Sequence, residues 1–373
     1  MPTTLIITND FPPRTGGIES FVADVVTLLD SDVAVYTSST PGSARSDRML
    51  GIEVVRGGPV LLPTPAATRR AVDLLRSSGA TRVLFGAAAP LGLMARSLRR
   101  AGAMRIVALS HGHETWWAAL PGSRSLLRRL ADDVDHLGTI SRYTESRIAP
   151  ALSPAARSRL IRLAPPVDGS LFQPLVPAPA RRRPRVVSVG RLVRQKGFDS
   201  LLRAWRWVLE DWPAAPLPEL VLLGDGPRRR SLAAMVDDLN LGSTVTMAGA
   251  MSRSAVVGEL QRADVFALLM RTRLAGLYPE GLGLAAIEAA ACGLPVVIGD
   301  SGGAPETVQP GRTGFVVDPR DERAVAAHLG RLLRDPDLAR SMGARGRAFV
   351  TDAFGAHRAR RVLRTALGLA DDG

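Results

Sequence analysis

The middle of the chain reads RVVSVGRLVRQKG from Arg185 to Gly197. The apolar run 186–189 predicts a buried strand, and the residues after it predict a loop at the strand's carboxyl end. Lys196 is the only lysine of the chain, since the other 47 of its 48 basic residues are arginine. Lysine offers a compact charge on a flexible stem, which arginine does not reproduce. The stretch therefore predicts a phosphate-binding loop that uses Arg191 and Lys196, with a lysine on a solvated turn as the alternative.

Short apolar runs alternate with longer amphipathic stretches on both sides of this loop, which predicts a parallel sheet covered on both faces in each half. The expected strands are residues 5–8, 33–36, 83–85, 106–109 and 137–140, then 185–189, 220–223, 245–248, 265–269 and 296–298. Helices are expected at 18–29, 69–77, 91–101, 125–131 and 144–149.

The two halves are separated by a proline-rich stretch at 164–184, which is typical of a linker. We expect a first domain at 1–165, a linker at 166–184, a second domain at 185–350, and a C-terminal helix at 351–373 that returns to the first domain. The expected fold is α/β, with two doubly wound Rossmann-like domains facing across a cleft. Ligands of such sheets bind at the carboxyl ends of the strands.

Composition narrows the class of partner. The 373 residues carry a formal charge of +13, which favours a nucleotide, a nucleic acid or an anionic membrane surface. Aromatic residues make up only 5%, and the arginines are scattered, which argues against a nucleic-acid interface. The single cysteine permits no internal disulfide, as expected for a cytoplasmic protein. We find no apolar run long enough to span a membrane, so any membrane contact is expected to be peripheral.

Two glutamates eight residues apart, Glu280 and Glu288, frame a second motif. This spacing equals about 2.2 helical turns, so both carboxylates are expected near one face of a helix that starts around Leu282. The backbone N–H groups of Gly281, Leu282 and Gly283 are expected to be open to a phosphate at the helix start. Glu288 would be the only charge on an apolar helix and would need a partner, such as ribose hydroxyls. The alternative is a pair of solvated carboxylates.

Two further loops follow expected strands. His111, His113 and Glu114 come directly after the run 106–109 and could orient a substrate by hydrogen bonds or bind a metal. No second cluster of ligand residues accompanies them, so we expect no metal site. Gly16 and Gly17 precede the first expected helix and could leave N–H groups open to a phosphate, although two glycines are weak evidence by themselves.

The four motifs, in this order, resemble the retaining nucleotide-sugar glycosyltransferases of the GT-B fold. The chain is more closely similar to the actinobacterial phosphatidylinositol mannoside mannosyltransferases, which use GDP-mannose to form an α-1,6 linkage. The residues that carry this resemblance are TNDFPPR at 8–14, FGAAAPL at 85–91, HGHE at 111–114, LPGSR at 120–124 and SGGAPETV at 301–308.

The resemblance implies a role for each motif. Arg191 and Lys196 would neutralise the leaving diphosphate, and Glu288 would hold the ribose. Glu280 would contact the donor sugar, beside the N–H groups at 281–283, and His111 would orient that sugar. Gly16 and Gly17 would line the phosphates, and His113 and Glu114 would bind substrate. No cofactor or metal is implied.

The resemblance also implies partners: a nucleotide-sugar donor and a lipid or sugar acceptor. Basic residues of the first domain favour peripheral binding to an anionic membrane surface at the inner face of the cell membrane, and they are Arg69, Arg70, Arg124, Arg128 and Arg129. The alternative is a half-buried helix with a solvated basic edge. Residues 115–117 and 274–279 depart from the family's pattern, so a related transferase with another donor and a soluble acceptor stays open. A nucleotide-sugar epimerase of the same fold is a further alternative.

Overall fold

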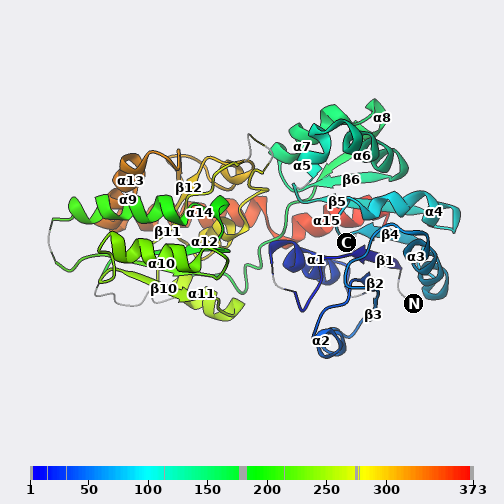
Figure 1. Cartoon of the computed structure of the whole chain (residues 1–373), viewed down its shortest axis with the longest axis horizontal. Coiled ribbons are helices and arrows are strands. Elements are labelled where there is room, and N and C mark those ends of the chain that lie inside the picture. The colour runs from blue at the N-terminus through cyan, green and yellow to red at the C-terminus, as the bar shows by residue number, and fades with distance from the viewer. Residues whose placement is uncertain are drawn as a thin grey trace. The chain divides into compact units, whose positions relative to one another are not determined.

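The computed structural model describes residues 3–369, apart from positions 15, 31, 113, 176–182, 214, 274, 275 and 277. The chain forms two compact units, each built around its own sheet (Figure 1). The first comprises Met1–Pro166 together with Ala356–Gly373, and the second comprises Val167–Gly355.

Every strand of the first unit runs parallel to its neighbours, in the order β3-β2-β1-β4-β5-β6-β7. The strands are β1 (Thr4–Thr8), β2 (Val33–Thr37), β3 (Glu53–Arg56), β4 (Arg82–Phe85), β5 (Arg105–Ser110), β6 (His136–Thr139) and β7 (Leu160–Arg162). The helices are α1 (Gly17–Leu28), α2 (Ser43–Leu50), α3 (Pro65–Ser78), α4 (Ala95–Arg100), α5 (Glu114–Ala119), α6 (Pro121–Asp133), α7 (Arg142–Ile148), α8 (Pro154–Arg157) and α15 (Ala356–Leu367), with 3-10 turns η1 (Leu91–Met94) and η2 (Ala149–Ala151).

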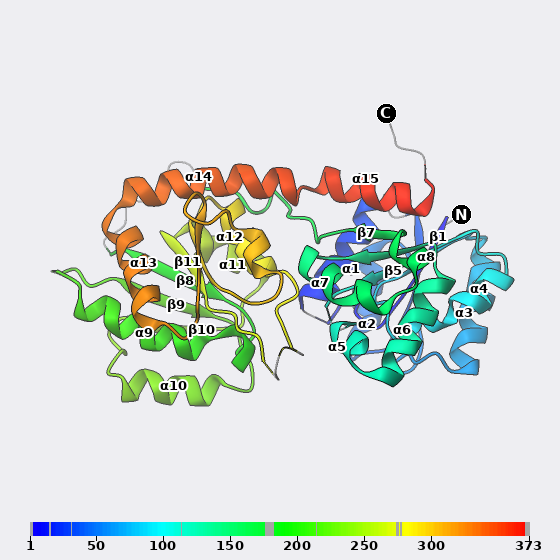
Figure 2. The same cartoon turned by 90° about the horizontal axis from the view of Figure 1, so that it is seen from above.

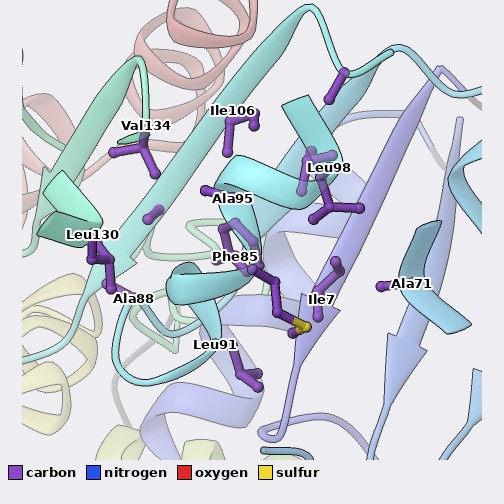
Figure 3. Close-up of a cluster of buried hydrophobic side chains, with 14 of the residues drawn as sticks. Ile7, Ala71, Phe85, Ala88, Leu91, Ala95, Leu98, Ile106, Leu130 and Val134 are labelled. Carbon is purple, nitrogen blue, oxygen red and sulfur yellow. The ribbon is translucent and has the colours of Figure 1, made fainter. Parts of the chain in front are cut away.

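Both faces of this sheet are buried. Alternate strand residues, among them Ile7, Phe85 and Ile106, pack against a layer that contains Leu98 of α4 and Leu130 of α6 (Figure 3). Helices α1 and α15 contact each other, and α15 also packs on β5 and β7. Burying a side chain such as Phe85 stabilises the fold by about 1.5–3 kcal/mol. Because the strands are apolar along their length, helices that cover both faces of the sheet stabilise it.

The second unit has a parallel sheet of the order β10-β9-β8-β11-β12-β13. Its strands are β8 (Arg185–Val189), β9 (Glu219–Leu223), β10 (Val245–Gly249), β11 (Val265–Leu268), β12 (Val296–Gly299) and β13 (Gly314–Val317). Its helices are α9 (Phe198–Glu210), α10 (Arg229–Asp238), α11 (Arg253–Gln261), α12 (Leu284–Ala291), α13 (Glu322–Arg334) and α14 (Pro336–Ala353), with η3 (Arg194–Lys196) and η4 (Ala304–Thr307). Figure 2 shows α9 and α10 on one side of this sheet and α12 and α14 on the other.

The structure differs from the sequence analysis in two segments, the expected linker and the expected C-terminal helix. Val167 donates its N–H to Phe354 O at 2.8 Å, and Phe172 is fully buried, so residues 167–175 belong to the second unit. Positions 176–182 of the expected linker lie outside the described residues. The expected C-terminal helix is divided, because α14 ends at Ala353 in the second unit and α15 belongs to the first.

Candidate functional site

The second sheet changes direction of winding between β8 and β11. These strands are neighbours, but the chain leaves β8 towards β9 on one side and leaves β11 towards β12 on the other. The loops that follow β8 and β11 therefore diverge, and such a point is where parallel sheets bind ligands. The loop after β8 carries Lys196, and the segment after β11 carries Glu280.

These two loops are joined by side-chain contacts. Lys196 Nζ lies 2.7 Å from Glu280 Oε2, and the two side chains are only 22% and 12% exposed. The neighbouring Gln195 donates through Nε2 to the carbonyl of Pro279 at 2.7 Å. The structure thus brings together two residues that the sequence places 84 positions apart, and it makes Glu280 the resident partner of the lysine.

At two glycines, the backbones of these loops and of neighbouring segments pack closely together. Gly197 has a φ of 68°, and a Cβ there would lie 1.8 Å from Leu269 O. Gly302 has a φ of 57°, and a Cβ there would lie 2.0 Å from Glu280 O. Only glycine combines this φ with this approach. Ser301, which is almost fully buried, accepts the N–H of Glu280 at 3.2 Å and so adds a side-chain link that the sequence analysis missed.

The helix after Glu280 begins later than the sequence analysis expected. Helix α12 starts at Leu284, with Gly283 as its N-cap at a φ of 92°, so Glu280 lies outside the helix. The expectation that helical spacing sets the geometry of Glu280 and Glu288 is therefore wrong. Contacts with Lys196 and Ser301 place Glu280 instead. Gly281 and Leu282 lie between it and the helix, and Leu282 is buried.

Glu288 does lie on α12, but it is not isolated. Arg253, at the first turn of α11, places Nη2 3.9 Å from Glu288 Oε1, and the glutamate side chain is 17% exposed. The apolar sequence of α12 hides this partner because it comes from another helix. Arg191 is exposed, and its side chain has no recorded partner within the described part of the chain.

In the first unit, His111 follows the carboxyl end of β5. It is 9% exposed, its Nε2 lies 2.5 Å from Gly86 O, and its ring packs edge-on against Phe21 with centroids 5.6 Å apart. These contacts hold the imidazole against the loop after β4. A histidine held in this way presents one orientation to a ligand rather than many.

Of the other two residues of this motif, Glu114 is engaged within the protein, although the sequence analysis expected it to bind substrate. Glu114 is 2% exposed, and its carboxylate accepts from Ser110 Oγ at 2.8 Å and from the N–H of Ala89 at 3.3 Å. We therefore interpret Glu114 as a residue that ties the loops after β4 and β5 together. His113 lies outside the described residues.

The start of α1 carries the glycine pair. Gly16 is the N-cap and Gly17 the first helical residue, and both are exposed. The carboxylate of Glu19 covers Gly16 closely, since a Cβ on that glycine would lie 2.3 Å from Glu19 Oε2. An anion bound here would have to displace this side chain, because like charges repel.

No group of three or more His, Cys, Asp or Glu side chains with the geometry of a metal site occurs among the residues that the structure describes. Within the same residues, no helix has the length and apolar character needed to cross a bilayer.

Comparisons with known proteins agree with this arrangement. The model of the group 1 glycosyl transferases matches residues 176–349, and the model of glycosyltransferase family 4 matches residues 15–168. A GDP-mannose-dependent alpha-(1-6)-phosphatidylinositol monomannoside mannosyltransferase of Mycolicibacterium smegmatis is 42% identical, across 93% of this chain and 94% of its own length. One from Corynebacterium glutamicum, described as acting on the monoacylated acceptor, is 39% identical across 93% of both chains. The crystal structure of Anabaena HepE in complex with UDP superposes with a TM-score of 0.83 across 98% of this chain and 99% of its own, at 16% identity.

Proposed function

Since the chain belongs to the group 1 glycosyl transferases, in the family of the GDP-mannose-dependent phosphatidylinositol monomannoside mannosyltransferases, we propose that it transfers mannose from GDP-mannose to phosphatidylinositol monomannoside in an α-1,6 linkage. The observation that carries this proposal is the 42% identity over nearly the whole of both chains. The α/β fold with two parallel sheets is the one expected for this activity.

The chemistry requires charge stabilisation at the leaving group. The bond between the mannose anomeric carbon and the β-phosphate oxygen breaks, an acceptor hydroxyl bonds to that carbon, and its proton passes to the departing diphosphate. Attack from the side of the leaving group retains the configuration. The ammonium of Lys196 and the guanidinium of Arg191 would offset the charge that develops on the diphosphate, and such electrostatic stabilisation is usually the largest single contribution to catalysis.

The remaining residues bind and orient. Glu280 holds Lys196 at 2.7 Å in this structure, which supports a role at the donor sugar beside the diphosphate. Glu288, next to Arg253, is proposed to accept from the ribose hydroxyls, and the N–H groups at 281–283 to bind phosphate. His111 is proposed to hydrogen-bond the mannose, with Gly16 and Gly17 near the phosphates.

The proposal is tested with the purified full-length chain and two donors, GDP-mannose and UDP-glucose. Each donor is combined with phosphatidylinositol monomannoside, with a soluble inositol phosphate, or with no acceptor, and products are separated by thin-layer chromatography. We expect a new mannolipid from GDP-mannose and the lipid acceptor only. Transfer to the soluble acceptor alone would favour the related transferase, and conversion of the donor without transfer would favour an epimerase.

We further propose that the first unit binds the anionic inner face of the cell membrane peripherally. The sequence of this unit has 24 arginines and 15 acidic residues, so it holds most of the net charge. Arg124, Arg128 and Arg129 of α6 are exposed beside Leu120 and Leu126, which are 48% and 41% exposed. Arg69 and Arg70 of α3 are exposed as well. A basic side chain near anionic lipid contributes about 1 kcal/mol, so the three arginines of α6 would bind such a surface reversibly.

Co-sedimentation with vesicles tests this surface. Wild-type protein is expected to bind anionic but not neutral vesicles, and to be released by high salt. Arg124→Glu/Arg128→Glu should abolish binding. Arg262→Glu/Arg320→Glu changes the net charge equally on the second unit, where these side chains are 60% and 86% exposed, and should still bind. An equal loss of vesicle binding in both variants would show that net charge, and not the surface of the first unit, determines binding.

A further inference from the structure

Arg271 makes two hydrogen bonds to the loop that carries Lys196. It lies three residues beyond the end of β11, and its Nε donates to Arg194 O at 2.9 Å. Its backbone N–H donates to Gln195 O at 2.9 Å. Arg194 and Gln195 are the first two residues of η3, and Lys196 is the third. Arg271 therefore binds the backbone of the turn from which the lysine side chain extends.

Asp199 in turn fixes Arg271. The guanidinium Nη2 contacts both carboxylate oxygens, at 2.9 and 2.8 Å, and Nη1 contacts Ser200 Oγ at 3.3 Å. Asp199 is 13% exposed and also faces Arg228 Nη1 at 3.4 Å. Charge-assisted contacts of the planar guanidinium restrict its orientation, so the position of Nε towards Arg194 O is determined by the first turn of α9.

All three guanidinium nitrogens of Arg271 thus have acceptors within the second unit. The group has little capacity left for a phosphate, and its effect on a ligand must pass through the loop. A lysine side chain has many rotamers, so the place of its ammonium depends on a fixed backbone. Holding η3 in place lowers the entropy lost when the ammonium meets an anion.

We propose that Arg271, oriented by Asp199, is a positioning residue that holds the 194–196 turn so that Lys196 meets the donor diphosphate. This inference rests on the proposed function, which assigns Lys196 to that diphosphate. It adds a role for two residues whose charged groups are engaged with each other and with the loop, and it predicts that their effect depends on Lys196.

The test measures binding of GDP and of guanosine, which lacks both phosphates, to the full-length chain. The main variant is Asp199→Asn/Arg271→Gln, because it removes one positive and one negative charge and leaves the net charge unchanged. We expect GDP to bind about tenfold more weakly and guanosine within about twofold of wild type. Arg185→Gln is the matched control, since Arg185 also bridges two carboxylates, Glu259 at 2.7 Å and Glu219 at 3.1 Å, at the opposite end of β8. It should lower thermal stability but leave GDP affinity unchanged.

A double-mutant cycle with Lys196→Ala decides how Arg271 acts. In the Lys196→Ala background, the Asp199→Asn/Arg271→Gln change should weaken GDP binding by less than about twofold, because the residue being positioned is absent. The inference would be overturned by a further tenfold loss of GDP affinity in that background, or by a loss of guanosine affinity equal to that of GDP. Neither result would contradict the assignment of Lys196 to the donor site. If Lys196→Ala itself does not weaken GDP binding, the donor-site assignment fails and the positioning role fails with it.

Discussion

Lys196 Nζ and Glu280 Oε2 lie 2.7 Å apart at the carboxyl edge of the second sheet. The pair is partly buried, so its Coulomb attraction is opposed by the loss of hydration of both ions. A donor diphosphate arriving at this edge would share the ammonium with Glu280. The lysine would therefore meet its anion from an already fixed position, and the contact would require little new ordering.

Removing the lysine should impair transfer without unfolding the chain. Charge-assisted hydrogen bonds contribute about 1.5–3 kcal/mol each, so Lys196→Ala is expected to lower turnover of GDP-mannose at least about tenfold. Lys196→Arg keeps the charge but not the compact ammonium, and it should also lose activity. Initial rates and thermal melting are the measurements. Near wild-type rates in Lys196→Ala would disprove the assignment.

Gly302 offers a test with an internal control. A Cβ at Gly302 would lie 2.0 Å from Glu280 O, so Gly302→Ala should displace the Glu280 segment. We expect activity to fall more than tenfold, which corresponds to a rise of about 1.4 kcal/mol or more in the activation free energy. Gly311 has a similar positive φ of 74°, but no atom lies within 4 Å of its added Cβ. Gly311→Ala should therefore show only the backbone strain, as a modest drop in stability with normal kinetics. Equal kinetic loss in both variants would argue against a specific effect on Glu280.

We expect transfer to be independent of divalent metal. The motivation is the pair of cations, Arg191 and Lys196, assigned to the diphosphate, which supply the charge that a metal ion supplies in other phosphate sites. Initial rates are compared in excess EDTA and after addition of Mg²⁺ or Mn²⁺. Unchanged rates are the expected result. Activity that disappears in EDTA and returns with the metal would refute the expectation.

Acid should weaken the second unit through Asp199. Burial raises the pKa of Asp199, but the hydrogen bond and charge of Arg271 and the charge of Arg228 outweigh it and hold the pKa below its ordinary value of 3.8. A lowered pKa means that the unfolded state binds the proton more tightly, so this stability is present above pH 3.8 and is lost as the pH falls below it. The free energy of unfolding, measured in urea, should differ most between wild type and Asp199→Asn near neutral pH. A difference that is constant down to the acid limit would contradict this linkage.

Cys292 should resist thiol reagents in the folded chain. Burial, followed by the nearby charge of Glu288, raises the pKa of its thiol to about 12, and the side chain is 4% exposed. At pH 8 its thiolate fraction is then roughly a thousandfold below that of a free thiol with a pKa near 8.5. Labelling by a chromogenic disulfide should be slow in native buffer and immediate in denaturant. Fast labelling of protein with an unchanged melting temperature would show that the thiol is accessible.

The apolar runs of the sequence determined the central strands of both sheets. Strands such as β1 and β11 are buried on both faces, so hydrophobic residues occupy consecutive positions in them. The sequence analysis missed β3, β7 and β13, and each of these is an edge strand. Edge strands are half solvated and mix charged or small residues with apolar ones, as Glu53 and Arg56 do in β3. Their pairing depends on a neighbour that the local pattern does not specify.

The sequence alone marked Lys196, Glu280 and Glu288 as candidates by residue type and spacing, because a single lysine and two isolated carboxylates stand out against their surroundings. Only the tertiary structure decided how they are held. Glu280 is placed by Lys196 and Ser301 rather than by a helix, Glu288 has Arg253 as a partner, and Arg271 grips the lysine's turn. These contacts join residues 21 to 84 positions apart, and no local pattern encodes them because sheet topology, not sequence distance, brings the loops to one edge.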